Sequence, residues 1–536
     1  MSTELARRLQ TSLGGFSEIT AVSQRAINAG LVKLVKEHPE LAHVKCKSKA
    51  GHYLDAEIEQ PLISLKVTGA SRAGFEYMAR FGSGKLHFNY EDSVGKVDYE
   101  IKGWTVAFNV QIDLATIEPG SAEDKEVRGA IKQPGDYSLT SLFLTFNKGD
   151  IIKPNMKHCD FKGANLDSDD IITLGGILAK WFVDEGPMID RRKRTVAYGL
   201  HTAKPDTVNA DAPSFPPTSL KLQTYEYIAP GEDKPKEGLE NGRNNMLLYL
   251  QMTDSKKFPS EPILPYSGNF VSDGMDGTMC IEKGIFWDRY LLRTTGPRLL
   301  HLFNNATYAW VKSTNLSQVT EPDWEIGIGD GGHGDMNFFN WAPSTDGSMS
   351  WTWGDPPQDE QHKITKETHG RLEITCTTKN RMEAQPGSNI IDLSGKTNIL
   401  ADGGCGGGMS APWACSYKVH VWLEWQTKVT LNAVEDGGFS LSLDLAKNNF
   451  KVGADEVKTD CAMAIGVMDR LVKACDKMKT QLEDSLAKAP LHDIAAKLQT
   501  DLNNSARFVV PGKGTFKYQN PVFNNNGDVM IEVGYK

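Results

Sequence analysis

Apolar residues near the start of the chain follow a helical period. Ile27, Leu31 and Leu34 share one face of a helix at this spacing, and Ser23 is a residue type that caps a helix N-terminus. The opposite face mixes charges of both signs, unlike the dense cationic face of a helix that lies on a membrane. The pattern predicts a helix over residues 23–38 whose apolar face lies in the protein's own core.

From residue 54 onward the spacing changes to alternation, in which every second residue is apolar. Glycines lie between these runs or near their ends, where turns and bulges need them. We therefore predict a string of antiparallel strands, whose apolar face the helix over residues 23–38 covers. The alternating runs are 54–58, 63–67, 75–81, 86–90, 97–101 and 104–114.

Both patterns recur along the rest of the chain. Strand-like stretches are 137–146, 220–225, 246–252, 417–431 and 439–445, with a closing hairpin of 515–518 and 529–535. Helical stretches are 171–183, 285–303 and 461–504, and the last carries the apolar stripe Ile465, Met468, Val472, Cys475, Leu482 and Leu486. We predict an α+β fold, mainly antiparallel β, with strongly curved sheets wrapped around long helices in an elongated body.

At 536 residues the chain is too long for one ordinary core. Residues 1–190 are expected to form a segment of helix plus curved sheet, and 191–330 a loop-rich middle segment. Residues 331–536 are expected to hold a second curved sheet, the long helix and the closing hairpin. We find no clean internal repeat.

Charge and cysteine usage narrow the class of protein. The net charge of −9 gives no overall attraction to nucleic acid, so no nucleic-acid partner is predicted. The eight cysteines are scattered, which is typical of reduced, buried thiols. No long apolar run follows Arg7 and Arg8, and residues 171–183 are too short to span a bilayer. We expect a soluble chain, either cytoplasmic or exported without a classical signal peptide.

Motifs of known chemistry are absent from the sequence or lack the helix or further ligands that their function requires. Glycines over residues 327–334 match a dinucleotide-binding spacing, but no helix is predicted after them. His333 and Asp335 in that loop are too few for a metal site, and the glycines of residues 402–408 also indicate a loop. No nucleophile elbow or zinc-protease motif is present. We predict no catalytic residue, metal or cofactor, and a non-enzymatic function is favoured.

One dense basic cluster stands out: Arg191, Arg192, Lys193 and Arg194. Such a cluster suits anionic lipid head groups, and hence an anionic membrane surface. A solvated loop with no partner has the same composition, and both interpretations stay open.

Three stretches carry a resemblance to a known family: 212–225 (APSFPPTSLKLQTY), 246–253 (MLLYLQMT) and 276–292 (DGTMCIEKGIFWDRYLL). They resemble the accessory proteins encoded beside clostridial neurotoxins, in particular the forty-seven-kilodalton member, of the tubular lipid-binding (TULIP) superfamily. The resemblance extends over most of the chain, but its motifs contain no catalytic residues. It implies a curved antiparallel sheet wrapped around a long helix.

The resemblance also implies binding of a lipid or other hydrophobic ligand, or a role in a toxin-like complex with protein partners. A slot between sheet and helix suits an acyl chain, which gains about 0.8 kcal/mol for each CH₂ buried. The aromatic candidates for lining it are Trp181, Phe182, Phe286, Trp287 and Tyr290, which the pattern alone assigns to the core. The alternatives are an interaction subunit with a closed core and an enzyme of unrecognised type that uses the glycine-rich loops.

Overall fold

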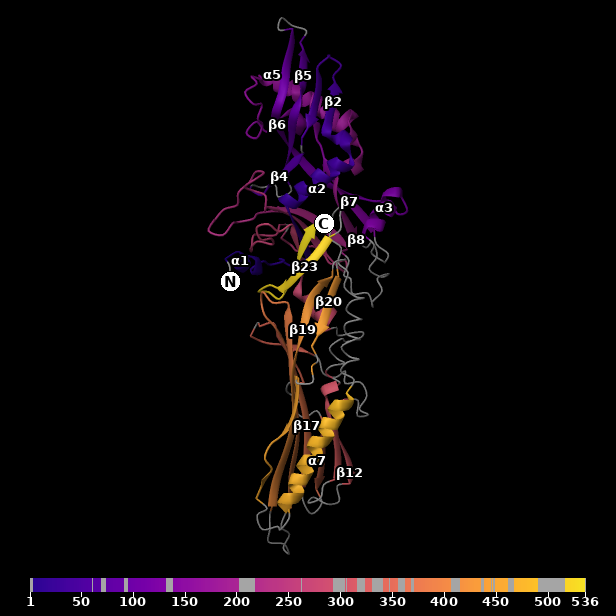
Figure 1. The fold of residues 1–536 in the computed structure, drawn as a ribbon, viewed down its shortest axis with the longest axis vertical. Coiled ribbons are helices and arrows are strands. Elements are labelled where there is room, and N and C mark those ends of the chain that lie inside the picture. The colour runs from indigo at the N-terminus through magenta and orange to yellow at the C-terminus, as the bar shows by residue number, and fades with distance from the viewer. Residues whose placement is uncertain are drawn as a thin grey trace. The chain divides into compact units, whose positions relative to one another are not determined.

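The structure is a computed structural model that describes most of the chain (Figure 1). The described residues are 3–59, 61–68, 74–90, 95–131, 138–201, 217–261, 263–292, 304, 306–315, 323–329, 341–346, 348–354, 362–367, 371–405, 415–434, 438–444, 446, 449–460, 467–489 and 516–535. Neighbouring strands run antiparallel in each sheet, and one sheet is strongly curled into a half-barrel. The fold is therefore α+β and mainly antiparallel, as predicted. Among the described helices, none combines the length and apolar character that a membrane span requires.

Backbone contacts divide the chain into two compact units. Unit 1 comprises Met1–Glu282, Ala433–Gly438 and Ala506–Lys536, and unit 2 comprises Lys283–Asn432 and Phe439–Ser505. Unit 2 is thus inserted in the sequence of unit 1. Unit 1 contains the expected segment 1–190 together with most of 191–330, and the division into three segments remains a prediction from the sequence alone.

Unit 1 holds two sheets and most of the helices. Its helices are α1 Thr3–Leu9, α2 Gln24–Glu37, α3 Ala122–Ile131, α4 Lys148–Ile152 and α5 Ser168–Ala179, the short helices η1 Pro39–Ala42, η3 Pro187–Ile189 and η4 Arg191–Arg194, and the π-helix η2 Lys180–Glu185. One sheet has the order β23-β24-β11-β1-β10-β9, and the other β2-β3-β5-β6-β7-β8 with β4 on β5. The strands are β1 Glu18–Ser23, β2 His43–Lys47, β3 Tyr53–Ile58, β4 Leu62–Lys66, β5 Gly74–Asn89, β6 Lys96–Thr116, β7 Ser138–Thr145, β8 Thr195–His201, β9 Ser219–Tyr225, β10 Met246–Met252, β11 Gly277–Ile281, β23 Phe516–Phe523 and β24 Val529–Tyr535.

The long strands β5 and β6 each join two runs that the sequence analysis separated. The glycines between those runs were expected at turns or bulges. The strands continue through them, so they form no turn, and Gly82 and Gly84 lie at a register shift against β3. A Cβ atom at Gly84 would lie 2.4 Å from the Cβ of Ala56. This glycine therefore permits a close approach of β3, next to the bulge between Ala56 and Ile58.

Helix α2 confirms the first prediction from the sequence. The hydroxyl of Ser23 accepts a hydrogen bond from the Ala26 amide at 3.3 Å and caps the helix. Ile27, Leu31 and Leu34 are buried in one cluster with residues of β4, β5 and β6. The apolar face of α2 therefore lies in the core of unit 1.

Polar side chains of α2 also cover the edge of β4. The Asn28 side chain donates to the Ile63 carbonyl at 3.0 Å and accepts from the Ile63 amide at 2.8 Å. The Leu65 amide donates to the Gln24 side chain at 2.8 Å. These bonds satisfy backbone groups of β4 that its pairing with β5 leaves open.

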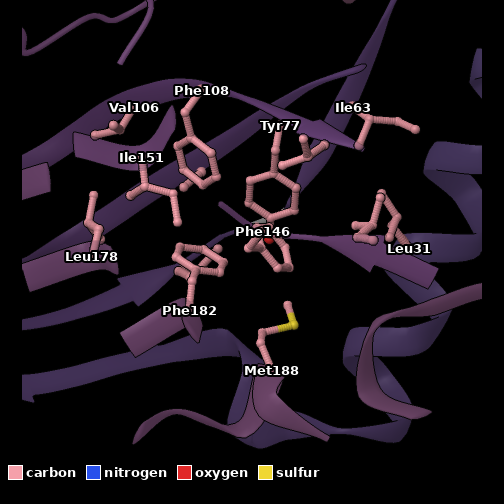
Figure 2. Packing of buried hydrophobic residues seen from close by; sticks show 14 of the residues in the cluster. Leu31, Ile63, Tyr77, Val106, Phe108, Phe146, Ile151, Leu178, Phe182 and Met188 are labelled. Atoms are coloured by element: carbon pink, nitrogen blue, oxygen red, sulfur yellow. The ribbon is translucent and has the colours of Figure 1, made fainter. Parts of the chain in front are cut away.

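Aromatic rings fill the centre of this core (Figure 2). The ring centroid of Phe182 lies 4.7 Å from that of Phe146, 5.3 Å from that of Phe108 and 5.5 Å from that of Tyr77. Leu31 and Met188 are part of the same cluster. The contacts of Phe182 with Phe108 and Tyr77 are edge-to-face and that with Phe146 is tilted, and together they pack η2 against the sheet.

The C-terminal hairpin completes the other sheet of unit 1. β24 pairs with β11, and β23 pairs with β24, as the predicted closing hairpin requires. Its turn is held by the N-terminal segment, since the Asn524 side chain donates to the Thr11 carbonyl and the Asn525 amide donates to that of Leu9, both at 2.9 Å. Strands from both ends of the chain thus share one sheet.

Unit 2 is a long antiparallel sheet with one long helix. The sheet has the order β14-β15-β17-β18-β19-β20, with β16 on β17 and both β21 and β22 on β19, while β12 and β13 form a separate pair. The elements are the π-helix η6 Gly284–Leu291, β12 Ala309–Asn315, β13 Asp323–Ile328, β14 Ala342–Pro343, β15 Ser350–Trp353, β16 His362–Glu367, β17 Arg371–Ala384, β18 Ile390–Cys405, β19 Cys415–Val434, β20 Gly438–Leu443, β21 Phe450–Ala454, β22 Lys458–Thr459 and α7 Val467–Lys488.

Helix α7 confirms the long helix predicted over 461–504, within the residues described, but corrects its buried face. It contacts β13 and β21 and buries Leu471, Cys475, Met478 and Leu482. Met468 and Val472, expected in the buried stripe, are instead 43% and 40% exposed. Both sets fit a helical period, so spacing alone did not separate the covered face from its neighbour.

A buried polar group lies on the inner face of the unit 2 sheet. The hydroxyls of Thr378 and Thr397 are 3.3 Å apart, and both donate to the Thr307 carbonyl, at 3.3 and 2.8 Å. The Asn380 side chain donates to that of Asn304 at 2.7 Å. These bonds tie the segment before β12 to β17 and β18.

Candidate functional site

The aromatic residues predicted to line a lipid site fall into two groups. Trp181 and Phe182 lie in η2 and are buried in the core of unit 1. Phe286 and Trp287 lie in η6 of unit 2, where the ring centroid of Trp287 is 4.4 Å from that of Trp351. The side chain of Tyr290 lies outside the described residues. Their role in lipid binding remains a prediction.

The basic cluster forms the short helix η4, and its side chains contact groups of unit 1. Arg191 pairs with Glu123 at 2.5 Å, Arg192 with Asp190 at 3.8 Å and Lys193 with Glu40 at 3.0 Å, and Arg194 donates to the Leu144 carbonyl at 3.2 Å. These contacts compensate part of the cationic charge. Binding of anionic head groups by η4 remains a prediction.

The glycine-rich stretches are only partly described. His333 and Asp335 lie outside the described residues, as does most of 327–334. Residues 402–405 belong to strand β18 and not to a loop. A Cβ at Gly403 would lie 2.2 Å from the Tyr417 ring, so this glycine makes room for an aromatic side chain of β19.

A polar cluster around Glu76 in unit 1 is structural. Nδ1 of His158 lies 2.5 Å from one Glu76 oxygen, and Asn155 donates to the other at 2.5 Å. Burial raises the pKa of the neighbouring Cys159 thiol, which disfavours a reactive thiolate. Among the described residues, no group of three His, Cys, Asp or Glu side chains is arranged to hold a metal ion. The cluster anchors the segment that follows α4 against the sheet.

Glu18 is a buried acid in β1. Its Oε1 atom has no hydrogen-bond partner among the described residues. Burial raises the pKa of this carboxyl to about 8, and the charge of Asp254 adds to the shift. The folded protein therefore holds Glu18 protonated at neutral pH.

A pocket of about 610 Å³ lies on the unit 2 sheet. Its volume falls within the range of small-molecule sites. Four cationic side chains and one acidic side chain line it, so that it carries a net charge of about +3 in a chain of net charge −9. The lining residues are Thr352, Lys379, Asn380, Arg381, Ser394, Gly395, Lys396, Glu424, Trp425, Gln426, Asn449 and Lys451.

Strand register explains how these residues meet. One row across the sheet is Lys379, Lys396, Glu424 and Lys451, and the adjoining row is Thr352, Arg381, Ser394 and Gln426. Both rows share the outer face, because side chains two positions apart in a strand point the same way. The row between them is Asn380, Gly395 and Trp425. The buried side chains of Asn380 and Trp425 lie on the opposite face, so this row supplies backbone to the floor of the pocket.

The charged side chains of the pocket are held in place by neighbours. Nζ of Lys396 lies 2.6 Å from a carboxylate oxygen of Glu424. The ammonium groups of Lys396 and Lys451 lie 5.5 and 5.3 Å from the centroid of the Trp422 ring. The Trp422 indole in turn donates to Asp455 at 3.1 Å. The half-buried tryptophan therefore orients two of the cations.

This pocket was not predicted from the sequence. Alternation within residues 417–431 was visible, and it places Trp422, Glu424 and Gln426 on one polar face. The cations come from three other strands, and cross-strand register is not readable from one sequence.

Comparisons with known proteins complete the description. No family model matches the chain, and no curated protein matches it. Among solved structures, the chain is similar to P47 from Clostridium botulinum A2 and to P47 of Clostridium botulinum E1, each with 10% identity and a TM-score of 0.44. These matches cover 98% and 97% of this chain and 99% of each P47 chain. A lipopolysaccharide binding protein also matches, with 10% identity, a TM-score of 0.31 and coverage of 97% of this chain and 99% of that chain.

The first two of these solved structures are of the forty-seven-kilodalton protein whose family the sequence resembles.

Proposed function

We propose that the protein is a non-catalytic binding protein for an amphipathic ligand of the lipid class, and that α7 of unit 2 receives the ligand's apolar part. The observation that carries the proposal is the exposure of Met468 and Val472, at 43% and 40%. They lie one helical turn apart, on the face next to buried Leu471 and Cys475. The apolar strip of α7 thus continues past the part that the sheet covers.

Charge in the same unit supports an amphipathic occupant. α7 contacts β21, and β21 carries Lys451 of the cationic pocket. An acyl chain fits the strip, since its burial gains about 0.8 kcal/mol for each CH₂. An anionic head group matches the charge of the sheet.

The test uses the full chain, purified without detergent. Native mass spectrometry should show a co-purifying lipid, and the fluorescent fatty acid cis-parinaric acid should bind. The double variant Met468→Ser, Val472→Ser should weaken probe binding on the order of tenfold, because it removes apolar area from the contact. Since both side chains are exposed, its melting temperature should match that of the parent.

The matched control is Ile172→Ser, which removes an apolar side chain that is 53% exposed on α5 of unit 1. It should bind the probe as the parent does. The proposal fails if the parent protein carries no lipid and binds no probe, or if the double variant binds as the parent does. Sedimentation that shows a dimer abolished by the double variant would assign the strip to a second copy and also overturn it.

A further inference from the structure

We propose that the pocket on the outer face of the unit 2 sheet is a binding site for an anionic group of the phosphate type. This pocket carries the positive charge that the proposed function assigns to an anionic head group. The inference does not rest on the proposed lipid binding, since inorganic phosphate has no apolar part and can bind without the α7 strip. The ligand chemistry of the pocket follows from the side chains that the sheet brings together.

Positive charge is concentrated in this pocket. Three strands supply the cations, the consecutive β17 and β18 and the later β21, and register places them around one depression. The cations are Lys379, Arg381, Lys396 and Lys451. Four cationic side chains and one carboxylate line this depression, so an anion that enters it is attracted. A concave surface of one sign also concentrates the potential and attracts counter-ions.

The side chains that line the pocket, and its volume, suit a phosphate group. Arg381 offers a planar fork of N–H donors, and Ser394, Gln426 and Asn449 add hydroxyl and amide donors beside it. A volume of about 610 Å³ exceeds what a single phosphate ion needs. The site therefore suits a phosphate group carried by a larger polar molecule, with the lysines as point charges around it.

A bound anion can replace the carboxylates that now pair with two of the cations. Arg381 pairs with Glu383 at 2.9 Å and Lys396 pairs with Glu424 at 2.6 Å, but in each pair both side chains are at least one-third exposed. Exposed ion pairs of this kind contribute little, so a multivalent anion can replace them at low cost. Glu424 then opposes the anion and limits its affinity.

The Trp422 ring restricts the positions of two lysines. Because its ring lies beneath the ammonium groups of Lys396 and Lys451 and its indole N–H is held by Asp455, both cations lose less freedom when an anion binds. The aromatic ring is thus a positioning group for the pocket and makes no contact with the anion itself.

The experiment measures binding of inorganic phosphate and pyrophosphate to the full chain by calorimetry. A parallel arm measures binding to phosphatidylcholine vesicles with and without phosphatidic acid. The double variant Lys396→Gln, Lys451→Gln should weaken binding on the order of tenfold, and Glu424→Gln should strengthen it about threefold. Binding should also weaken as salt rises.

The matched control is Lys418→Gln. Lys418 shares the outer face of β19 and pairs with Asp402 at 3.0 Å, but it does not line the pocket. Its variant should bind as the parent does. Unchanged melting temperatures of all variants are expected, because the changed side chains are exposed, and Glu424→Gln tests the site by a gain that misfolding cannot mimic.

The two arms identify the source of the anion. Binding to phosphates alone supports a free phosphorylated molecule, and binding to phosphatidic acid vesicles supports a lipid head group. Both results support the site when the double variant weakens them. Absence of binding in both arms, binding that the double variant leaves intact, or binding that Glu424→Gln weakens would overturn the proposal.

Discussion

The sheets of units 1 and 2 are both antiparallel, but they differ in one buried cross-strand pair. At the centre of unit 1, Tyr77 and Phe108 are cross-strand partners, and their ring centroids lie 5.4 Å apart. At the centre of unit 2, Thr378 and Thr397 are cross-strand partners that share hydrogen bonds with the Thr307 carbonyl. Both pairs are buried. Both sheets form from strands in which apolar and polar residues alternate. The residue type of the buried cross-strand pair decides whether ring contacts or hydrogen bonds stabilise that position.

This difference assigns different sources of stability to the two units. The centre of unit 1 depends on the burial of apolar area and on contacts between rings. An unpaired charge placed among these side chains would be strongly destabilising. Unit 2 depends in part on buried hydrogen bonds, whose loss leaves polar groups unpaired. Substitutions test this difference between the units, and they are given below from the largest expected change in stability to the smallest.

The largest effect is expected from Leu31→Asp in α2. The change places an unpaired carboxylate in the core of unit 1, where even Leu→Ala costs about 2–5 kcal/mol, so a larger loss of unfolding free energy is expected. Thermal unfolding followed by circular dichroism measures it. The exposed position in the other unit gives the control, Met468→Asp, which should leave the transition nearly unchanged. Equal effects of the two changes would break the comparison.

A smaller but pH-dependent effect is expected from Glu18, the buried acid of unit 1. Burial raises the pKa of this group from 4.5 to about 8. Between these two values the folded state keeps a proton that the unfolded state releases. Stability contributed by Glu18 is therefore fully present below the unfolded pKa, and it is lost as pH rises toward the folded value, at roughly 1.4 kcal/mol per pH unit.

Glu18→Gln should remove this slope and leave the protein more stable than the parent above the folded pKa. Urea unfolding at a series of pH values measures the effect, and Glu232→Gln, at an exposed acid in the same unit, is the control. A parent protein whose stability rises over the interval, or whose slope survives in Glu18→Gln, would contradict the assignment.

A smaller effect is expected from removing the hydroxyl of Thr378 in unit 2. Thr378→Val in unit 2 should cost about 1–3 kcal/mol, because the buried amide of Ala309, which donates to this hydroxyl at 3.1 Å, loses its acceptor. Thr378→Ser keeps the hydroxyl and is the matched control. Chemical denaturation that ranks Thr378→Val as the milder of the two changes would contradict a polar centre in unit 2.

The smallest effect, of opposite sign, is expected from Tyr77→Phe in unit 1. The Tyr77 hydroxyl is buried with no hydrogen-bond partner among the described residues, and burial raises its pKa. Removing it should leave stability unchanged or raise it by about 1 kcal/mol, since no bond is lost and a desolvated polar group disappears. The same denaturation experiment measures it. A loss comparable to that of Thr378→Val would reveal a polar contact in the core of unit 1.

The sequence predicted local elements better than it predicted their relation. Ser23, Ile27 and Leu31 indicated α2, because a cap and a stripe are local signals. The glycines of β5 and β6 indicated turns or bulges, and the sequence could not separate the two; the close approach of Ala56 is what requires a glycine at Gly84. On α7, Met468 and Val472 fit the helical period, but the contacts with β13 and β21 decide which face is covered. The cationic pocket was missed because its residues meet only through cross-strand register.

The shared sheet of unit 1 has a consequence for the order of synthesis. β11 ends at Ile281, and its partner β24 begins at Val529, about 250 positions later in the chain. At roughly 5–20 residues per second, a ribosome needs between about ten seconds and one minute to supply that strand. During this time the edge of β11 waits unpaired while the whole of unit 2 emerges. Exposed strand edges template pairing with other chains. The nascent protein is therefore expected to need protection of this edge from a chaperone until its last strand arrives.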